Sequence, residues 1–215
     1  MTQVTPPERV RNPRGQGERL RAELISAALD LLADTGDPEQ VSIRGVAKSA
    51  GVSATAAYRH FDDRDALIAA ACDACFGEFA QRMLQATNAA SDPFERLTAA
   101  GAAYLDYARA EHGHYRVLFS NPLVAKAEAP DFPTEPDPGG TAFQQLVTLV
   151  TDCLTAGAQP TISDDPVYLS FHIWTSIHGI VDLASTHPAL PWPDLDLMFR
   201  DSQRALGLDR AGPRG

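Results

Sequence analysis

Apolar side chains recur at intervals of three and four residues along most of the chain, which is the spacing of one face of an α-helix. Between these runs stand Gly, Pro and small polar residues that end or cap helices. No segment has the alternating pattern of a half-buried strand. The sequence therefore predicts an all-α protein. The predicted helices span residues 18–35, 43–50, 54–61, 65–88, 93–113, 114–120, 141–155, 167–186 and 195–206.

Residues 42–61 are the most informative stretch of the chain. We expect Ser42 to cap a two-turn helix, Gly51 to end it, and Ser53 to cap a second short helix. Two short helices joined by such a turn make a helix-turn-helix, whose second helix enters the major groove of DNA. An ordinary helical hairpin fits the same spacing, so the pattern alone leaves both interpretations open.

The predicted outward face of the second short helix carries hydrogen-bond donors and no acid. The donors are Thr55, Tyr58, Arg59 and His60, and small Ala residues separate them. A slender helix surface fits a major groove about 12 Å wide. These features favour contact with nucleic acid.

The formal net charge of −10 is unevenly distributed along the chain. Residues 1–64 hold nine Lys or Arg and nine Asp or Glu, whereas residues 65–215 hold nine and nineteen. Five Arg lie between residues 9 and 21. A local basic surface is what contact with phosphates requires, because binding is driven by displaced counterions. A solvated charged tail is the alternative interpretation of residues 9–14.

The N-terminal third resembles a known family in several motifs. Residues 28–36 read A-L-D-L-L-A-D-T-G, residues 41–53 read V-S-I-R-G-V-A-K-S-A-G-V-S, and residues 58–67 read Y-R-H-F-D-D-R-D-A-L. Together they are similar to the N-terminal domain of TetR/AcrR-type regulators, without a gap over residues 18–70. The resemblance implies a three-helix helix-turn-helix domain at 18–64 and a larger helical ligand-binding and dimerisation domain at 65–207. The Pro and Gly residues of 1–17 predict a disordered basic arm before them.

The resemblance also suggests which residues contact DNA. We expect Ser42, Tyr58, His60 and Arg64 to contact phosphates, and Arg44, Thr55 and Arg59 to contact base edges. Arg19 and Arg21 are expected to add contacts to the DNA backbone. Ser53 and Ala54, at the start of the second helix, complete the predicted set. The family often has Gly-Thr two residues before the Tyr, where this chain reads Thr55-Ala56. A phosphate contact from Thr therefore cannot be carried onto Ala56, and the division between base and phosphate contacts is left open.

In the second half, the resemblance implies a small hydrophobic effector and a homodimer formed through residues 165–187 and 193–206. Residues 167–186 are apolar around more than half of the helix, which requires burial on more than one side. Trp174 and His178 lie one turn apart and are expected either to line an effector pocket or to belong to the core. Further candidates for the pocket are Tyr104, Tyr107, Phe119 and Phe143.

Other chemistry has weaker support. The chain has no Gly-rich phosphate loop and no G-x-S-x-G motif, so we expect no enzyme and no cofactor. His112 and His114 do not belong to a recognisable metal-binding motif, so we expect no metal site. Cys72 and Cys75 are more consistent with core residues than with a redox pair. A redox sensor using Cys72 or Cys153, a non-catalytic small-molecule binder and an enzyme are the alternatives.

Location follows from what the sequence lacks. No run of 18 apolar residues could span a membrane, and the polar N-terminus does not read as a signal peptide, so we expect a cytoplasmic protein. Together these features predict a transcription regulator that binds a double-stranded, palindromic DNA operator as a homodimer, most simply a repressor released by its ligand.

Overall fold

The structure, a computed structural model, describes residues 16–120 and 142–210. Its described part contains helices and no strand, as the periodicity predicts. Residues 1–15, 121–141 and 211–215, which include most of the predicted basic arm and the Pro-rich segment 127–140, lie outside the described residues. The elements are α1 (Gln16–Thr35), η1 (Pro38–Gln40), α2 (Ile43–Ser49), α3 (Ala54–Ala57), α4 (Arg64–Asn88), α5 (Pro93–Ala110), α6 (His112–Ser120), α8 (Ala142–Thr155), α9 (Pro166–Thr186) and α10 (Leu195–Ala205).

The capping signals in the N-terminal part act as predicted. Oγ of Ser42 accepts a hydrogen bond from the backbone N–H of Gly45 (3.1 Å), and Oγ of Ser53 accepts one from Ala56 (3.2 Å). Gly51 has φ = +70°, the left-handed conformation that favours glycine after a helix. Helix α1 begins at Gln16, two residues earlier than predicted.

The second short helix is shorter than predicted. Helix α3 ends at Ala57, whereas the sequence pattern predicts a helix through Phe61. Beyond Ala57 the hydrogen bonds tighten: the N–H groups of Arg59 and His60 donate to carbonyls three residues back, at 3.3 Å and 2.9 Å. This tighter turning ends the α-helix while it keeps the chain coiled up to the buried ring of Phe61.

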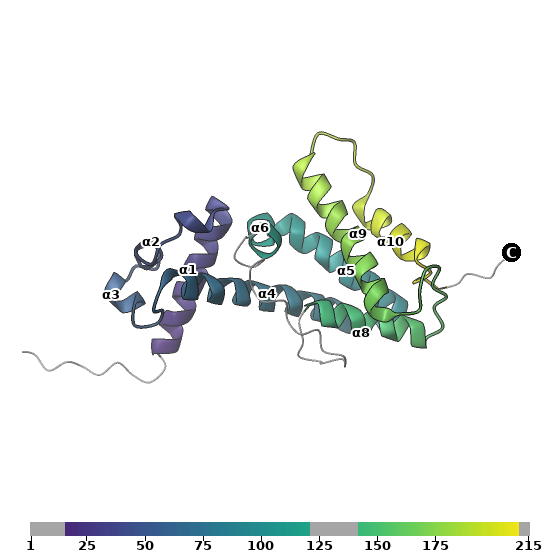
Figure 1. The fold of residues 1–215 in the computed structure, drawn as a ribbon, viewed down its shortest axis with the longest axis horizontal. Helices are drawn as coiled ribbons and strands as arrows, with labels where there is room; N and C mark the ends of the chain where they lie inside the picture. Colours follow the sequence, from purple (N-terminus) through teal and green to yellow (C-terminus); the bar gives the residue numbers. More distant parts are fainter. Residues whose placement is uncertain (1–15, 121–141, 211–215) are drawn as a thin grey trace, which may run out of the picture.

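Helix α4 joins the two parts of the molecule (Figure 1). It has 25 residues and is capped by Asp63, whose carboxylate accepts from the N–H of Ala66 at 2.8 Å. At a rise of about 1.5 Å per residue it is about 37 Å long. Its buried face, which includes Leu67, Cys75 and Phe79, packs first against α1 and then against α5. One continuous helix therefore connects the helix-turn-helix to the C-terminal bundle.

Helices α5, α8, α9 and α10 form the C-terminal bundle, in which α5 and α8 pack against α4 and α9 packs on α5 and α8 (Figure 1). The ring of Phe199 on α10 lies against Gly101 on α5, where a side chain would overlap it. Helix α6 packs against both α1 and α4. Its Gly113 approaches Ala33 so closely that an added Cβ would lie 2.7 Å from the Cβ of Ala33. The two parts of the molecule therefore touch through α6 as well as through α4.

Candidate functional site

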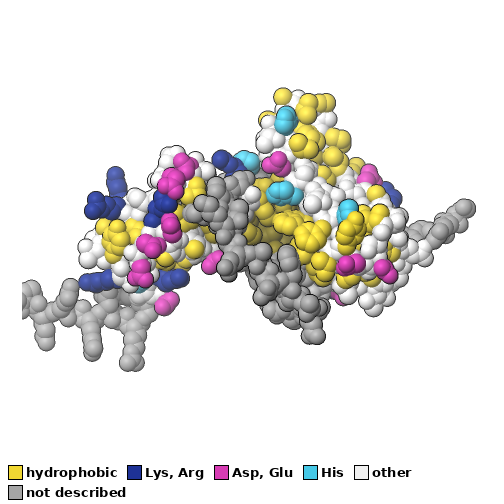
Figure 2. Space-filling view, in the orientation of Figure 1, with side chains coloured by type: hydrophobic (Ala, Val, Ile, Leu, Met, Phe, Trp, Pro, Cys, Tyr) yellow, Lys and Arg dark blue, Asp and Glu magenta, His cyan; other side chains and the backbone are white. Residues whose placement is uncertain are grey.

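The helix-turn-helix presents several of its predicted contact residues to solvent. Arg44 on α2, Thr55 on α3, and Tyr58 and Arg59 just after α3 are exposed, and 51% of the surface of Tyr58 is accessible. Lys and Arg side chains stand at this end of the molecule (Figure 2). Backbone and bases of a nucleic acid are the natural partners of such a set of donors.

The two cap residues can also bind a ligand while they cap their helices. Ser42 and Ser53 use Oγ as an acceptor for the N–H groups of their own helices. Their hydroxyl protons are not used in those bonds and can be donated to a phosphate oxygen. Ala54 is half-buried at the start of α3 and has no polar side-chain atom, so it could contact DNA only through its backbone or its methyl group.

The remaining predicted DNA contacts are engaged with the protein itself to different degrees. Arg19 is highly exposed and pairs with Glu23 one turn away (Nε–Oε1 2.8 Å). Arg21 lies over the ring of Phe61, 5.1 Å from its centroid. His60 is half-buried.

Arg64 is the most fully engaged residue of the predicted set. Its Nη1 and Nη2 each donate to one carboxylate oxygen of Glu39 at 3.0 Å, and its Nε donates to Asp65 at 3.1 Å. The sequence gives no sign of this pairing, because 25 residues separate Arg64 from Glu39.

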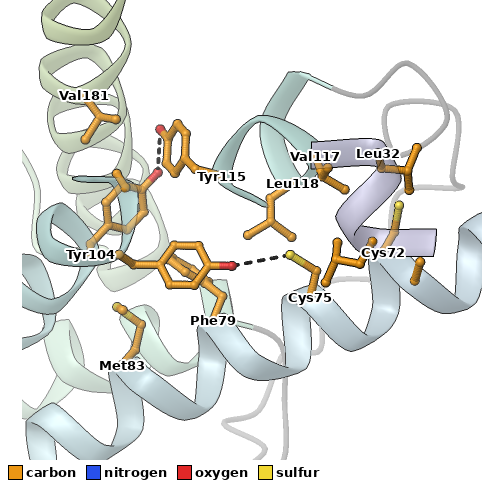
Figure 3. Packing of buried hydrophobic residues seen from close by; sticks show 14 of the residues in the cluster. Leu32, Cys72, Cys75, Phe79, Met83, Tyr104, Tyr115, Val117, Leu118 and Val181 are labelled. Atoms are coloured by element: carbon orange, nitrogen blue, oxygen red, sulfur yellow. Dashed lines mark hydrogen bonds between the residues drawn. The ribbon is translucent and has the colours of Figure 1, made fainter. Parts of the chain in front are cut away.

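In the C-terminal bundle, two tyrosines and a histidine form a compact hydrogen-bonded cluster. The hydroxyl of Tyr115 on α6 lies 2.8 Å from Nδ1 of His178 on α9, and that of Tyr104 on α5 lies 3.1 Å from the same atom. The two hydroxyls are 3.2 Å apart (Figure 3). The consecutive helices α5 and α6 therefore meet the distant helix α9 at one polar point inside an apolar region.

The Tyr104–Tyr115–His178 cluster is uncharged at neutral pH. Burial raises the pKa of Tyr104 far above its usual range and that of Tyr115 to about 12, so both hydroxyls keep their protons. Burial also lowers the pKa of His178, and the carboxylate of Asp182 opposes this only in part. A site of this character suits a neutral molecule with one hydrogen-bonding group better than it suits an ion.

The structure joins five of the six predicted effector residues in one chain of ring contacts. The ring of Phe119 lies 5.0 Å from His178 and 6.0 Å from Tyr104, measured between centroids. Trp174 lies 6.4 Å from His178 and 5.7 Å from Phe143. Tyr115 was absent from the predicted set, although it lies four residues before Phe119 and therefore on the same helix face.

Tyr107, the sixth candidate, lies apart from the other five. Its ring is separated from Tyr104 by Phe79, which contacts both rings at 5.2 Å. Its hydroxyl lies 3.4 Å from Sγ of Cys75, and the guanidinium of Arg82 lies over its ring. Only 1% of its surface is accessible, so Tyr107 serves the core between α4 and α5.

A surface groove of about 310 Å³ lies between α5, the end of α9 and the start of α10. Its walls include Leu105, Ala108, Val181 and Leu195, with Arg109 and His112 among the polar residues. None of the six predicted effector residues lines it. The groove and the aromatic cluster are therefore separate features of the bundle.

Comparison with known families identifies both halves of the chain. The family model of bacterial regulatory proteins of the tetR family matches residues 24–71, and that of the tetracyclin repressor-like C-terminal domain matches residues 97–206. The chain belongs to the TetR family. The predicted family and the all-α fold, with an N-terminal helix-turn-helix and a C-terminal helical domain, are thereby confirmed.

Individual relatives agree with membership of the TetR family. The transcriptional activator FasR of Mycolicibacterium smegmatis is 28% identical over 108 residues, which are 50% of this chain, and the chain spans about half (49%) of the length of FasR. A protein of unknown function from Rhodococcus sp. RHA1 has a structure with a TM-score of 0.71 at 25% identity, covering 92% of this chain and 100% of its own. A TetR family regulator from Marinobacter aquaeolei VT8 shares the fold, with a TM-score of 0.67 at 16% identity, covering 90% and 98%.

Membership of the TetR family bears on the alternative functions, an enzyme or a redox sensor. TetR-family proteins regulate transcription and catalyse no reaction, which confirms the prediction that the chain is not an enzyme. Cys72, Cys75 and Cys153 are all buried. Burial raises the pKa of the Cys75 thiol above its usual range, and it raises the pKa of Cys153 to about 12. Buried thiols that keep their protons are poor redox sensors, because the thiolate is the reactive form.

The part of the chain that the structure describes offers neither a metal site nor a membrane-spanning helix. That part contains no group of three or more His, Cys, Asp or Glu side chains placed to hold a metal ion. His112 is exposed, and His114 lies 3.8 Å from Glu111. No described helix has both the length and the apolar character that crossing a bilayer would need.

Proposed function

We propose that the protein is a ligand-responsive regulator of transcription, which binds a palindromic DNA operator as a homodimer. The observation that carries this proposal is the exposed set Arg44, Thr55, Tyr58 and Arg59 on a capped helix-turn-helix. Donors held on a rigid turn are suited to base edges and phosphates, and one such motif reads only half of an operator. We also propose a cytoplasmic location, as the sequence predicts.

The dimer is proposed to form through residues 165–187 and 193–206. This surface carries large apolar side chains that the single chain leaves exposed, among them Leu183 (50% accessible) and Leu197 (58%). Contiguous exposed apolar surface on a small protein marks an interaction site. Two copies of α9 and α10 would make a four-helix bundle and would present two recognition helices to the two halves of a palindrome.

The effector is proposed to be a small, neutral, largely hydrophobic molecule bound at the aromatic cluster of Tyr104, Phe119, Phe143, Trp174 and His178. The support is chemical: aromatic walls would bury an apolar body, and two hydroxyls and an imidazole would orient one polar group. Tyr115, which completes the hydrogen-bonded point, belongs to this proposed site. A ligand can weaken DNA binding only by its preference for the form of the dimer that does not fit the operator.

We propose repression, relieved by the effector, as the mode of control. The relative FasR is named as an activator, so the direction of control is a point for experiment. A reporter gene joined to the operator should be expressed more strongly when the regulator is deleted. Weaker expression after deletion would assign activation instead.

The decisive experiment is a fluorescence-anisotropy titration of the purified protein against DNA from directly upstream of its own gene. It should be run at two salt concentrations, with a scrambled duplex of equal composition as control. We expect tight binding to the upstream duplex, with an affinity that falls steeply with salt because phosphates are neutralised. The absence of binding to either duplex at low salt would refute the function. Light scattering of the same sample should show a dimer.

A further inference from the structure

The ion pair between Arg64 and Glu39 closes the two ends of the helix-turn-helix on each other. Glu39 lies in η1, directly before α2, and Arg64 is the first residue of α4, after α3. Nη1 of Arg64 donates to one carboxylate oxygen of Glu39 and Nη2 donates to the other, both at 3.0 Å. This paired geometry fixes orientation as well as distance, unlike a contact between two point charges.

Both partners are held on well-defined backbone. The carboxylate of Asp37 caps η1 by accepting from the N–H of Glu39 at 2.9 Å, and Nε2 of Gln40 donates to the same side chain at 3.1 Å. The buried side chain of Val41 anchors the end of η1. On the other side, Asp63 caps α4 beside Arg64. The ion pair therefore connects two firm elements and not two loose side chains.

The charges around Arg64 do not favour an additional anion. Its Nε also donates to Asp65 at 3.1 Å, so one guanidinium faces two carboxylates. The side chains of Glu39 and Asp65 are 75% and 69% accessible, whereas that of Arg64 is 31% accessible. A phosphate that approached this arginine would meet a local excess of negative charge. The geometry thus argues against the phosphate contact that the sequence suggests for Arg64.

We propose that Arg64 is a positioning residue: it fastens the start of the helix-turn-helix to the first turn of α4 and so sets the angle at which α3 meets DNA. This inference rests on the proposed DNA binding. A change in this angle should weaken the contacts of α3 with base edges more than the attraction to phosphates. The inference therefore predicts that loss of the ion pair affects binding to the operator more than binding to unrelated DNA. It also gives α4 a second attachment to the motif, besides the backbone.

The test compares Glu39→Gln with the wild type on the upstream duplex and on its scrambled control. If Arg64 held a phosphate, removal of the nearby negative charge would tighten binding to both duplexes. The positioning role predicts the opposite on the upstream duplex, about two- to fivefold weaker binding, the scale of an exposed ion pair, with no loss on the scrambled duplex. Glu23→Gln is the matched control, because it breaks an ion pair to Arg19 within a single helix.

Three further variants complete the test. Arg64→Lys keeps the charge but loses the paired geometry, and it should weaken binding to the upstream duplex as Glu39→Gln does, with an unchanged slope of log affinity against log salt. Loss of a phosphate contact would lower that slope by about 0.9 for Arg64→Gln. The double variant Glu39→Arg/Arg64→Glu should recover the wild-type preference for the upstream duplex. Tighter binding by Glu39→Gln, or no recovery in the double variant, would overturn the inference, whereas a wild type that binds neither duplex would overturn the proposed function instead.

Discussion

Replacement of Gly113 by Ala probes the contact between the two parts of the molecule. The new Cβ would lie 2.7 Å from the Cβ of Ala33 and 3.1 Å from its carbonyl oxygen. Carbon atoms in contact prefer about 3.5–4.0 Å, so α6 and α1 would have to separate by about 1 Å. Ala33 cannot yield by a change of rotamer, because its only side-chain atom is the Cβ.

The expected cost follows from two opposing effects. Overpacking of this kind costs about 1–3 kcal/mol, and the helix propensity of Ala returns at most about 1 kcal/mol. A net loss of about 1–2 kcal/mol lowers Tm by about 2–8 °C in a chain of this size. Gly77→Ala is the control: no atom lies within 4 Å of the added Cβ in the middle of α4, and we expect a rise in stability of about 0.5–1 kcal/mol.

Thermal unfolding followed by circular dichroism, at one fixed protein concentration, measures both variants. A fixed concentration is required because dimerisation makes Tm depend on concentration. The reasoning fails if Gly113→Ala unfolds at or above the Tm of the wild type while Gly77→Ala behaves as expected.

Five further predictions concern binding, pH and reactivity. Tyr58→Phe should weaken binding to operator and scrambled DNA alike by about 1 kcal/mol, and a loss on the operator alone would contradict a phosphate contact. Thr55→Ala should instead reduce the preference for the operator in the same anisotropy assay. Trp174→Ala should abolish release from DNA by any inducer found in a compound screen, with DNA affinity intact; an unchanged response would place the pocket elsewhere. Burial lowers the pKa of His178 below its unfolded value of 6.5, so the stability that comes from its neutral form is present above pH 6.5 and is lost as the pH falls below that value. Denaturant titrations should therefore show that the free energy of unfolding depends less on pH in His178→Phe than in the wild type. An equal pH dependence in both proteins would refute the assignment. The three buried cysteines should react with a thiol reagent only after denaturation, and rapid reaction of the native protein would support a redox sensor.

The sequence predicts the framework well because the relevant signals are local. Ser42, Gly51 and Ser53 act through their nearest neighbours along the chain, and the structure has each in its predicted role. The apolar periodicity of α4 and α9 likewise reports the side of each helix that is buried. The predicted end of α3 was wrong by four residues. After Ala57 the backbone changes to hydrogen bonds between residues three apart, and this change depends on how Phe61 is buried.

The contacts that decide the candidate sites are less predictable, since they join residues that are distant in sequence. Nothing near Arg64 indicates Glu39, and nothing near Tyr107 shows that Phe79 separates it from Tyr104. Spacing along one helix does predict that Trp174 and His178 share a face. It cannot predict that Tyr115 of α6 completes their polar point, because that depends on how three helices pack.

The close approach of α6 to α1 bears on how far the family can be recombined. A regulator with a new combination of sensor and target would have to join the N-terminal part of one protein to the C-terminal part of another. Here a cut at the start of α4 would pair a foreign surface with Gly113, which tolerates no extra atom opposite Ala33, and with Arg116, whose guanidinium covers Gly36. A functional hybrid would therefore have to exchange the end of α1 together with α6, so the unit of exchange is larger than the helix-turn-helix that the sequence marks out.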